Sequence, residues 1–359
     1  MEKENIKRIL VCPLGWGLGH ASRVIPIIKS LLDAGYKVIA AGDSPQLLLI
    51  SSSFPDIETI YFPSFDIRLS KQNTQLLPLI GIAFRLPYFT IKEHYLVKRI
   101  VIQNRIDFII SDNRYGLWCR GIKSILITHQ LCVIFPKPFH FLESIGIKVV
   151  RFLANQYDYC FIPDFKEDDN LAGKLSHPSH LPMNVRYIGL LSRYNDFKFD
   201  VTAPVWDLVG IASGPSPQRE IFIDLISQLA KNNNLKTLII KGNPAEGMNI
   251  KVDHDIFYVG HLKDSDFAKT ILSSKHLITR AGYSTIMDLA TLGISCLIVP
   301  TPGQTEQEYL ANYLATKGIF KTRKQTELCE IDISIAETNH IPSLDSKDFL
   351  EKALQKVMI

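Results

Sequence analysis

The stretch Leu277–Leu310, LITRAGYSTIMDLATLGISCLIVPTPGQTEQEYL, decides the fold of this chain. It opens on a short apolar run that predicts the end of a buried strand, and the turn Arg280–Tyr283 leads into a helical pattern from Ser284 onward. Gly293 ends that helix, and Ile294–Val299 predicts a second buried strand before a polar loop. A helix that starts at a glycine turn presents free backbone N–H groups and the positive end of its dipole, so the stretch predicts a phosphate-binding turn.

Polar side chains at the edges of these elements are candidate ligand contacts. Arg280 would add a fixed positive charge at the turn, and Asp288, one turn into the helix, could accept hydrogen bonds from sugar hydroxyls. The other candidates in the stretch lie in the turn or in the polar loop after the second strand: Gly282, Ser284, Thr285, Gln304, Glu306 and Gln307.

This pattern resembles the donor-binding signature of GT-B glycosyltransferases, and most closely that of glycosyltransferase family 28, which includes the N-acetylglucosaminyltransferase of the peptidoglycan lipid intermediate. In that family an Arg-small-Gly turn leads into a helix whose acidic residue holds the ribose of the donor. A strand ending in Pro is then followed by a loop whose Gln-containing pair reads the donor sugar. The resemblance covers about the C-terminal third of the chain and implies a ribose role for Asp288 and a sugar role for Glu306 with Gln307. Asp stands here where the family often has Glu.

Length and composition indicate a soluble protein of two domains. The chain has 359 residues, 46% of them hydrophobic and 21% charged. A net charge of only +4 argues against a nucleic-acid partner. The six cysteines show no C-x-x-C spacing, which is typical of reduced core residues in a cytosolic protein and not of a disulfide framework or zinc site. No signal peptide or membrane-spanning run is visible, so we expect a cytoplasmic location.

Strand and helix patterns alternate twice along the chain, which predicts an α/β protein with parallel sheets. Together with the resemblance, this gives two Rossmann-like domains facing a cleft, the GT-B fold. We expect an acceptor-side domain over residues 1–190, a linker over 191–207 and a nucleotide-sugar-binding domain over 208–340. Residues 341–359 predict a final helix, which in GT-B enzymes often crosses back to the first domain.

The loop Gly15–His20, GWGLGH, precedes the first predicted helix. It fails as a G-x-G-x-x-G dinucleotide motif because its sixth position is His20. The resemblance instead places this loop at the acceptor side of the cleft, where Gly17 and Gly19 let substrate approach the backbone. His20 is our candidate general base, because glycosyl transfer requires the acceptor hydroxyl to lose its proton. The alternative is that His20 only orients the start of the helix.

Two further loops carry candidate site residues. Asp112 follows a predicted parallel strand, where it could steer His20 or bind acceptor hydroxyls; the alternative is an Asx-turn or a cap for a helix over Tyr115–Arg120. His129, after the next strand, is more typical of a structural residue. The loop that opens the second domain offers three phosphate contacts, with a plain helix-entry turn as the alternative: Ser213, Gly214 and Arg219.

No metal ligand set is expected. The sequence Asp253-His254-Asp255 spells a D-x-D motif, but it precedes a strand of the second domain and is typical of a polar turn. GT-B enzymes generally stabilise the leaving diphosphate with a helix end and basic side chains, so the resemblance implies a metal-independent reaction without a cofactor.

Two segments mix aromatic, aliphatic and basic residues, Leu76–Ile106 and Phe135–Phe152. Such a composition suits the anionic inner leaflet of the plasma membrane and a lipid-linked acceptor. The alternative is ordinary core helices with basic outer faces.

These observations predict a hexosyl- or N-acetylhexosaminyltransferase that uses a nucleotide-diphosphate sugar, with a UDP-sugar favoured, in cell-envelope or surface glycan synthesis. The acceptor would be a glycan or a lipid-linked molecule. Two alternatives share the fold: a nucleotide-sugar 2-epimerase, which requires acidic residues converging on the sugar, and a non-catalytic nucleotide-sugar-binding protein.

Overall fold

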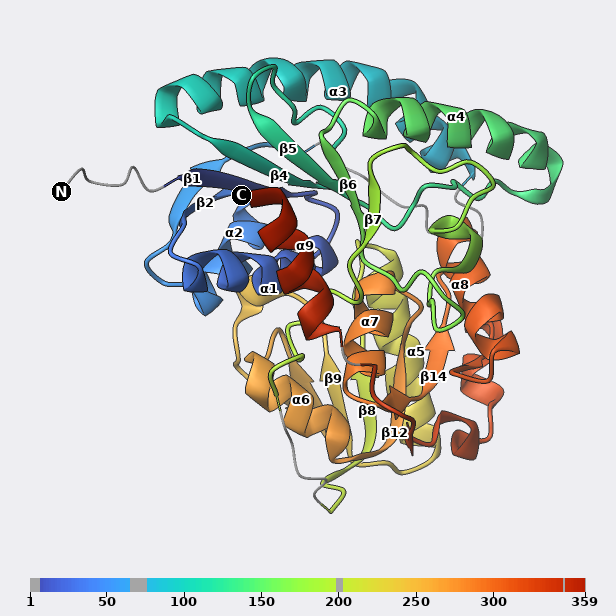
Figure 1. Ribbon diagram of the computed structural model, residues 1–359. Coiled ribbons are helices and arrows are strands. Elements are labelled where there is room, and N and C mark those ends of the chain that lie inside the picture. The colour runs from blue at the N-terminus through green and yellow to red at the C-terminus, as the bar shows by residue number, and fades with distance from the viewer. Residues whose placement is uncertain (1–6, 65–75, 198–202, 345, 359) are drawn as a thin grey trace.

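The computed structural model describes residues 7–64, 76–197, 203–344 and 346–358, and these form two α/β domains, each built on a seven-stranded sheet (Figure 1). The first domain lies above the second in Figure 1, and the two are joined by the segment that follows β7. The predicted architecture, two parallel-sheet domains in series, is confirmed.

The first sheet has the strand order β3-β2-β1-β4-β5-β6-β7, and every pairing in it is parallel. Its central strands are continuous apolar runs because helices cover both faces. The strands are β1 (Arg8–Pro13), β2 (Lys37–Gly42), β3 (Glu58–Tyr61), β4 (Phe108–Asp112), β5 (Lys123–Ile127), β6 (Tyr159–Ile162) and β7 (Val185–Tyr187). The helices are α1 (Gly19–Asp33), α2 (Ser44–Ser53), α3 (Leu76–Asn104) and α4 (Glu143–Ala154), with 3-10 turns η1 (Lys137–Leu142) and η2 (Gly173–Leu175).

The second sheet has the order β10-β11-β9-β8-β12-β14-β15 and is parallel except for the edge strand β10. Its strands are β8 (Trp206–Ile211), β9 (Thr237–Ile240), β10 (Lys251–Asp253), β11 (Ile256–Val259), β12 (Ser274–Arg280), β14 (Leu297–Val299) and β15 (Lys321–Thr322). The helices are α5 (Gln218–Asn232), α6 (Asp264–Leu272), α7 (Tyr283–Thr291) and α8 (Thr305–Thr316), with 3-10 turns η3 (Pro244–Glu246), η4 (Gln325–Glu330) and η5 (Ile333–Ala336).

Three local expectations differ from the structure. The run Ile294–Val299 is two strands, because β13 (Ile294–Ser295) pairs antiparallel with β16 (Asn339–His340) while β14 joins the main sheet. The apolar periodicity of Phe139–Ala154 predicts a single helix, but the structure has the 3-10 turn η1 up to Leu142 and the α-helix α4 from Glu143. Residues 115–120 form a turn and a bridge, not a helix, because Cys119 pairs with Ile122.

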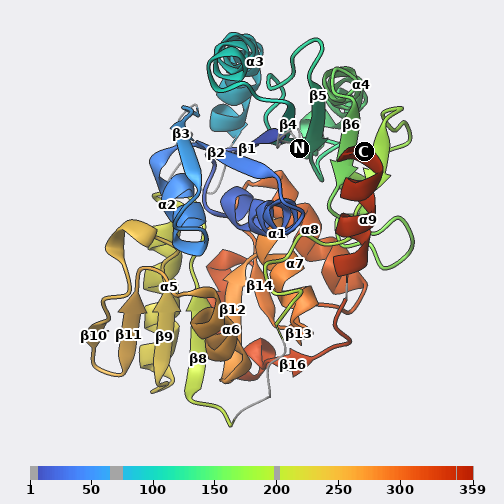
Figure 2. The same cartoon turned by 60° about the vertical axis from the view of Figure 1, so that its left-hand side comes forward.

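The last helix, α9 (Lys347–Met358), packs beside the first domain, next to α1 and β6 in Figure 2. Its apolar side chains belong to the core cluster that contains α1, and Lys7 Nζ donates a hydrogen bond of 3.0 Å to the carbonyl oxygen of Met358. Ser346 Oγ donates to the Leu190 carbonyl at 2.7 Å, which fixes the segment that leads into α9.

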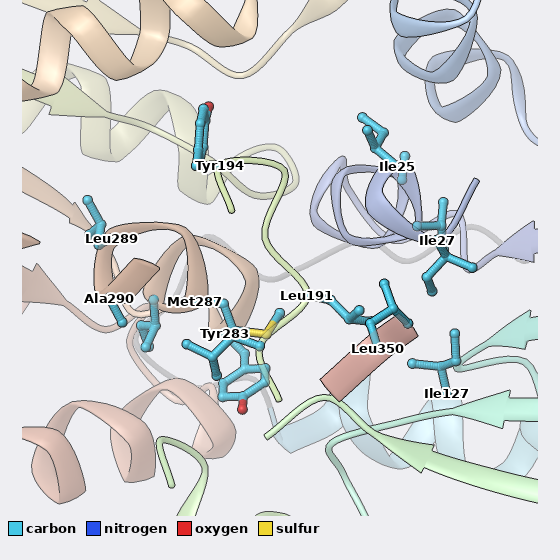
Figure 3. Packing of buried hydrophobic residues seen from close by; sticks show 14 of the residues in the cluster. Ile25, Ile27, Ile127, Leu191, Tyr194, Tyr283, Met287, Leu289, Ala290 and Leu350 are labelled. Carbon is cyan, nitrogen blue, oxygen red and sulfur yellow. The ribbon is translucent and has the colours of Figure 1, made fainter. Parts of the chain in front are cut away.

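The hydrophobic core continues from one domain into the other. Figure 3 shows Tyr283 and Met287 of α7 near Leu191 of the connecting segment, with Ile27 of α1 and Leu350 of α9 on the first-domain side. Both α1 and α7 start at this boundary, since Ser284 Oγ donates a 3.0 Å hydrogen bond to the Gly19 carbonyl. The fold therefore places the starts of two helices, one from each domain, against each other.

Candidate functional site

The first element of the site is a hydrogen-bonded pair formed by His20 and Asp112. His20 lies in the first turn of α1, and Asp112 ends β4, beside Pro13 at the end of β1. His20 Nδ1 is 2.9 Å from Asp112 Oδ2, and the Asp112 side chain is completely buried. The structure thus brings together the two residues that the sequence proposed as base and partner.

The contacts of both residues differ from those of helix caps, the purely structural role considered as an alternative for each. Helix α1 has Leu18 as its N-cap residue and no side-chain cap, while the His20 ring is turned to Asp112. No helix follows Asp112 that its carboxylate could cap, because the chain turns at Asn113 with a φ of 56°.

Burial and the neighbouring charged and polar groups together set the protonation of this pair. Burial, followed by the Arg23 charge, lowers the pKa of His20 against the opposing effect of Asp112, so the imidazole is neutral and able to accept a proton near neutral pH. Burial alone would raise the pKa of Asp112, but Arg23 and His20 outweigh it and lower that pKa, which keeps the carboxylate ionised.

Arg23 was not among the predicted site residues, yet its guanidinium is the centre of the cluster. It is 1% exposed, and its Nε donates to Asp112 Oδ1 at 2.7 Å. The same side chain approaches His129 Nδ1 to 3.2 Å. The only sequence signal was its spacing, three residues after His20 on a helix, which places both on one face.

Glu306 reaches the cluster from the second domain. It lies in the first turn of α8 and its Oε1 is 2.9 Å from His129 Nε2, while Gln130 Nε2 also donates to it. Burial would raise the pKa of Glu306, but its hydrogen bond with His129 and the charge of Arg23 act in the opposite direction, and the pKa is lowered. Tyr283 stacks on the His129 ring at 4.2 Å, so both domains contribute to one polar cluster.

The two glycine turns meet beside this cluster. A Cβ on Gly19 would lie 2.9 Å from Ser284 Oγ, so a larger residue there would displace Ser284 and loosen the contact between α1 and α7. Gly17 has a φ of 75°, which favours glycine. Gly282 is the N-cap residue of α7, and Thr285 is half-buried in its first turn.

Asp288 faces the segment between the domains. It is 7% exposed and accepts a 2.7 Å hydrogen bond from Ser192 Oγ, with Arg193 Nε 4.0 Å from its other oxygen. Burial raises the pKa of this carboxyl to about 6, against the opposing effects of Arg193 and Ser192.

The sequence predicts that Arg280 presents a positive charge at the phosphate-binding turn, but the structure places its side chain elsewhere. It is 1% exposed inside the second domain, where it donates to the Gln218 carbonyl at 3.0 Å and to Gln325 Oε1 at 2.6 Å. Its guanidinium lies 3.9 Å from the centre of the Phe222 ring, and burial lowers its pKa to about 9. The side chain turns inward because these acceptors and this ring come from distant parts of the domain, which a local pattern does not reveal.

The remaining candidates form local contacts. Arg219 pairs with Glu220 at 2.9 Å, Gln307 Oε1 accepts from the Thr301 N–H at 2.9 Å, and Gln304 is the N-cap residue of α8. Ser213 and Gly214 lie in the loop between β8 and α5, where Gly214 has a φ of 115°.

The D-x-D sequence is a surface turn between the antiparallel strands β10 and β11. Asp253 pairs with Lys231 at 2.8 Å, and His254 has a φ of 55°. Over the ranges that the structure describes, no group of three or more His, Cys, Asp or Glu side chains is arranged to hold a metal ion.

Comparison with known proteins agrees with the fold. Residues 213–339 match the glycosyltransferase family 28 C-terminal domain. A protein of Methanosarcina mazei described as an uncharacterized glycosyltransferase is 24% identical over 327 residues, which cover 87% of this chain and 84% of that protein.

Solved GT-B structures align with nearly the whole chain at low sequence identity. The spinosyn rhamnosyltransferase SpnG complexed with thymidine diphosphate is 14% identical, with a TM-score of 0.61 and coverage of 98% of this chain and 99% of that one. MurG of Acinetobacter baumannii is 16% identical, with a TM-score of 0.56 and the same coverages. UGT89C1 of Arabidopsis thaliana complexed with UDP is 14% identical, with a TM-score of 0.61 and coverage of 98% and 94%. The chain therefore has the fold of GT-B glycosyltransferases, and its residues 213–339 match the family 28 C-terminal domain.

Proposed function

We propose that this protein transfers a hexosyl or N-acetylhexosaminyl group from a nucleotide-diphosphate sugar, preferably a UDP-sugar, to an acceptor hydroxyl without a metal ion. The observation that carries the proposal is the His20–Asp112 pair, held on the first domain directly opposite the start of α7. Structural neighbours solved with UDP or thymidine diphosphate support a nucleotide donor.

The chemistry follows from the protonation of the pair. His20 Nε2 takes the proton of the acceptor O–H as the acceptor oxygen bonds to the sugar C1 and the bond from C1 to the diphosphate oxygen breaks. Asp112 stabilises the imidazolium that results, because its ionised carboxylate accepts a hydrogen bond from the Nδ1–H group. The starts of α1 and α7 offer N–H groups to the leaving diphosphate, which departs with the bonding electron pair.

The donor is proposed to lie on the second domain, with its ribose at Asp288 and its sugar at Glu306 and Gln307. Glu306 suits a sugar contact because its carboxylate lies at the domain boundary and stays ionised. Ser213, Gly214 and Arg219 complete the proposed diphosphate surroundings.

The acceptor is proposed to be a glycan or lipid-linked molecule of the cell envelope, met at an anionic membrane surface. Both views place α3 and α4 on the side of the first domain farthest from the second (Figures 1 and 2). Each helix exposes an apolar stripe, Tyr88, Ile91, Tyr95 and Ile102 on α3 and Ile145, Val149 and Phe152 on α4. Exposed Lys92, Lys98, Arg99 and Lys148 flank the stripes, and such a surface fits an anionic leaflet. No described helix is long and apolar enough to span a bilayer.

Vesicle sedimentation tests the membrane surface. The wild-type protein should bind vesicles that contain anionic lipid and release them at high salt, because the basic residues act through screened electrostatics. The double variant Ile102→Ser/Phe152→Ser should bind less, whereas Val252→Ser, which replaces an exposed apolar residue on the second domain, should bind as wild type. Equal binding to neutral and anionic vesicles would contradict the proposal.

A thermal-shift panel of nucleoside diphosphates and nucleotide sugars tests the donor. A ligand present at about 100 times its dissociation constant stabilises the folded protein by about 2.7 kcal/mol. Stabilisation by one nucleotide series identifies the donor, and no stabilisation by any member would remove the proposal. Slow hydrolysis of that donor in the absence of acceptor separates a transferase from a binding protein, and formation of the epimeric sugar would favour an epimerase.

A further inference from the structure

The carboxylate of Asp288 is held by a residue that lies outside the second domain. Ser192 belongs to the segment between β7 and β8 that connects the two domains, and it precedes residues 213–339, which match the family 28 domain. Its Oγ donates a 2.7 Å hydrogen bond to Asp288 Oδ1, and both residues are buried. One oxygen of the Asp288 carboxylate is therefore anchored by the connecting segment.

The hydroxyl of Ser192 is itself held in a fixed direction. Its oxygen accepts a 3.2 Å hydrogen bond from the backbone N–H of Tyr194, so the hydroxyl proton is left to donate to Asp288. The Tyr194 ring is buried and stacks on Phe267 of α6, with the two ring centres 6.0 Å apart. The turn that carries Ser192 is thus packed against the second domain.

Arg193 ties the same turn to α6 by charge. Its Nη1 donates to Asp264 Oδ1 at 2.6 Å, at the start of that helix. The guanidinium also lies 5.1 Å from the centre of the Tyr194 ring and 5.5 Å from that of Phe267, within the range of a cation–π contact. Because α6 and α7 belong to one domain, these contacts hold Ser192 Oγ at a fixed place relative to Asp288.

A bond at one oxygen orients the whole Asp288 carboxylate. An aspartate side chain turns about two single bonds, and the bond from Ser192 to Oδ1 selects one of its orientations. The second oxygen, Oδ2, lies 4.0 Å from Arg193 Nε, which is beyond hydrogen-bond distance. A carboxylate oxygen has two lone pairs, so Oδ2 keeps the capacity to accept from a ligand hydroxyl.

We propose that Ser192 is a positioning residue of the donor site, which orients the Asp288 carboxylate so that Oδ2 accepts a hydrogen bond from a ribose hydroxyl of the nucleotide. The inference rests on the proposed ribose role of Asp288 and extends it, because the ribose subsite is then completed by the connecting segment and not by the second domain alone. A carboxylate that is already oriented loses less side-chain freedom when the nucleotide binds.

Calorimetry with two nucleotides tests this role. UDP carries both ribose hydroxyls, and 2′,3′-dideoxyuridine 5′-diphosphate carries neither. The wild-type protein should prefer UDP by on the order of 10-fold, the worth of a hydrogen bond to a charged acceptor. Ser192→Ala should lower the affinity for UDP by roughly 3- to 10-fold and leave the affinity for the dideoxy nucleotide unchanged, because only the ribose contact depends on Ser192.

Ser176→Ala is the matched control. Ser176 is also buried, and its Oγ donates to the buried Asp164 Oδ2 at 2.7 Å in the first domain. Its removal deletes the same kind of bond away from Asp288, so the preference for UDP should stay as in the wild-type protein. A general disturbance of the fold would lower the affinities for both nucleotides together, which separates it from the loss of one ribose contact.

A double-mutant cycle tests whether Ser192 acts through Asp288. In the Asp288→Ala background, Ser192→Ala should have no further effect on the preference for UDP, because the carboxylate that it orients is gone. The double variant also removes the buried carboxyl, so no uncompensated charge remains to oppose folding.

The outcomes separate this role from the proposed function. An unchanged preference for UDP in Ser192→Ala, an equal loss of affinity for both nucleotides, or a further loss in the Asp288→Ala background would overturn the role of Ser192 while UDP binding stands. Equal wild-type affinities for the two nucleotides would overturn the ribose role of Asp288 and this inference with it. Absence of UDP binding by the wild-type protein would refute the proposed use of a UDP-sugar.

Discussion

Replacing Asp288 with Asn should stabilise the protein while weakening its nucleotide binding. The Asp288 carboxyl is 7% exposed and has Ser192, Arg193 and Asp264 as its polar or charged neighbours. Burial raises its pKa from 3.8 to about 6 because one serine and an arginine 4.0 Å away do not compensate for the lost water. An ionised Asp288 therefore costs folding free energy at neutral pH.

The size of the effect follows from the two pKa values. Between 3.8 and about 6 the folded state holds a proton that the unfolded state has released, so the stability contributed by this group falls as pH rises. At ~1.4 kcal/mol per pKa unit the full cost is about 3 kcal/mol, and about half of it develops between about pH 5 and about pH 8. Asn keeps a carbonyl oxygen to accept from Ser192 and carries no charge, so Asp288→Asn should recover most of this cost.

Denaturant unfolding of both proteins at these two pH values measures the difference directly. The advantage of Asp288→Asn should be larger at the higher pH. Asp207→Asn is the control, because a hydrogen bond from Lys275 lowers the pKa of Asp207 and its removal should bring no gain at high pH. A less stable Asp288→Asn protein at about pH 8, or an advantage independent of pH, would refute the reasoning.

The same variant tests the ribose role by calorimetry. Loss of a charge-assisted hydrogen bond to a ribose hydroxyl should cost about 1.5–3 kcal/mol of nucleotide binding. Unchanged affinity in a stabilised Asp288→Asn protein would leave Asp288 with a structural role only.

Three further substitutions have expected outcomes. His20→Ala and His20→Asn should both bind donor and both lose turnover by about 10²–10⁴-fold, because neither side chain can take a proton; near wild-type turnover of His20→Asn in a transfer assay would retire the base. Gly19→Ala should weaken the interdomain contact and raise the donor KM, because its Cβ would lie 2.9 Å from Ser284 Oγ, whereas Gly81→Ala has open space and should change no kinetic constant. Arg280→Lys should destabilise the protein by about 1–3 kcal/mol, because it keeps the buried charge but not the planar fork that donates to both the Gln218 carbonyl and Gln325; a thermal melt equal to that of wild type would contradict this structural role.

Sequence patterns were sufficient for the architecture because they act locally. Apolar runs of strand length alternate with helical periodicity, and this alternation fixes two parallel sheets whatever the details of packing. The turn before Tyr283 and the loop before His20 were located in the same way, since a glycine between a buried strand and a helix start is visible in one stretch of sequence. Splitting of the run Ile294–Val299 was not visible, because the partner of β13 is β16, which follows it by more than forty residues.

The residues of the site likewise fall into those that a local sequence pattern identifies and those whose contacts depend on the packing of distant segments. The sequence by itself singled out His20 and Asp112, because each follows a predicted strand of a parallel sheet and such strand ends share one edge. Only the tertiary structure decided the contacts of the charged side chains. Arg23 became the centre of the cluster and Arg280 turned into the second domain, because a buried guanidinium goes where acceptors from distant segments meet it. The hydrogen bond between His129 and Glu306 joins residues 177 positions apart, and no local pattern encodes a contact that exists only when the two domains pack together.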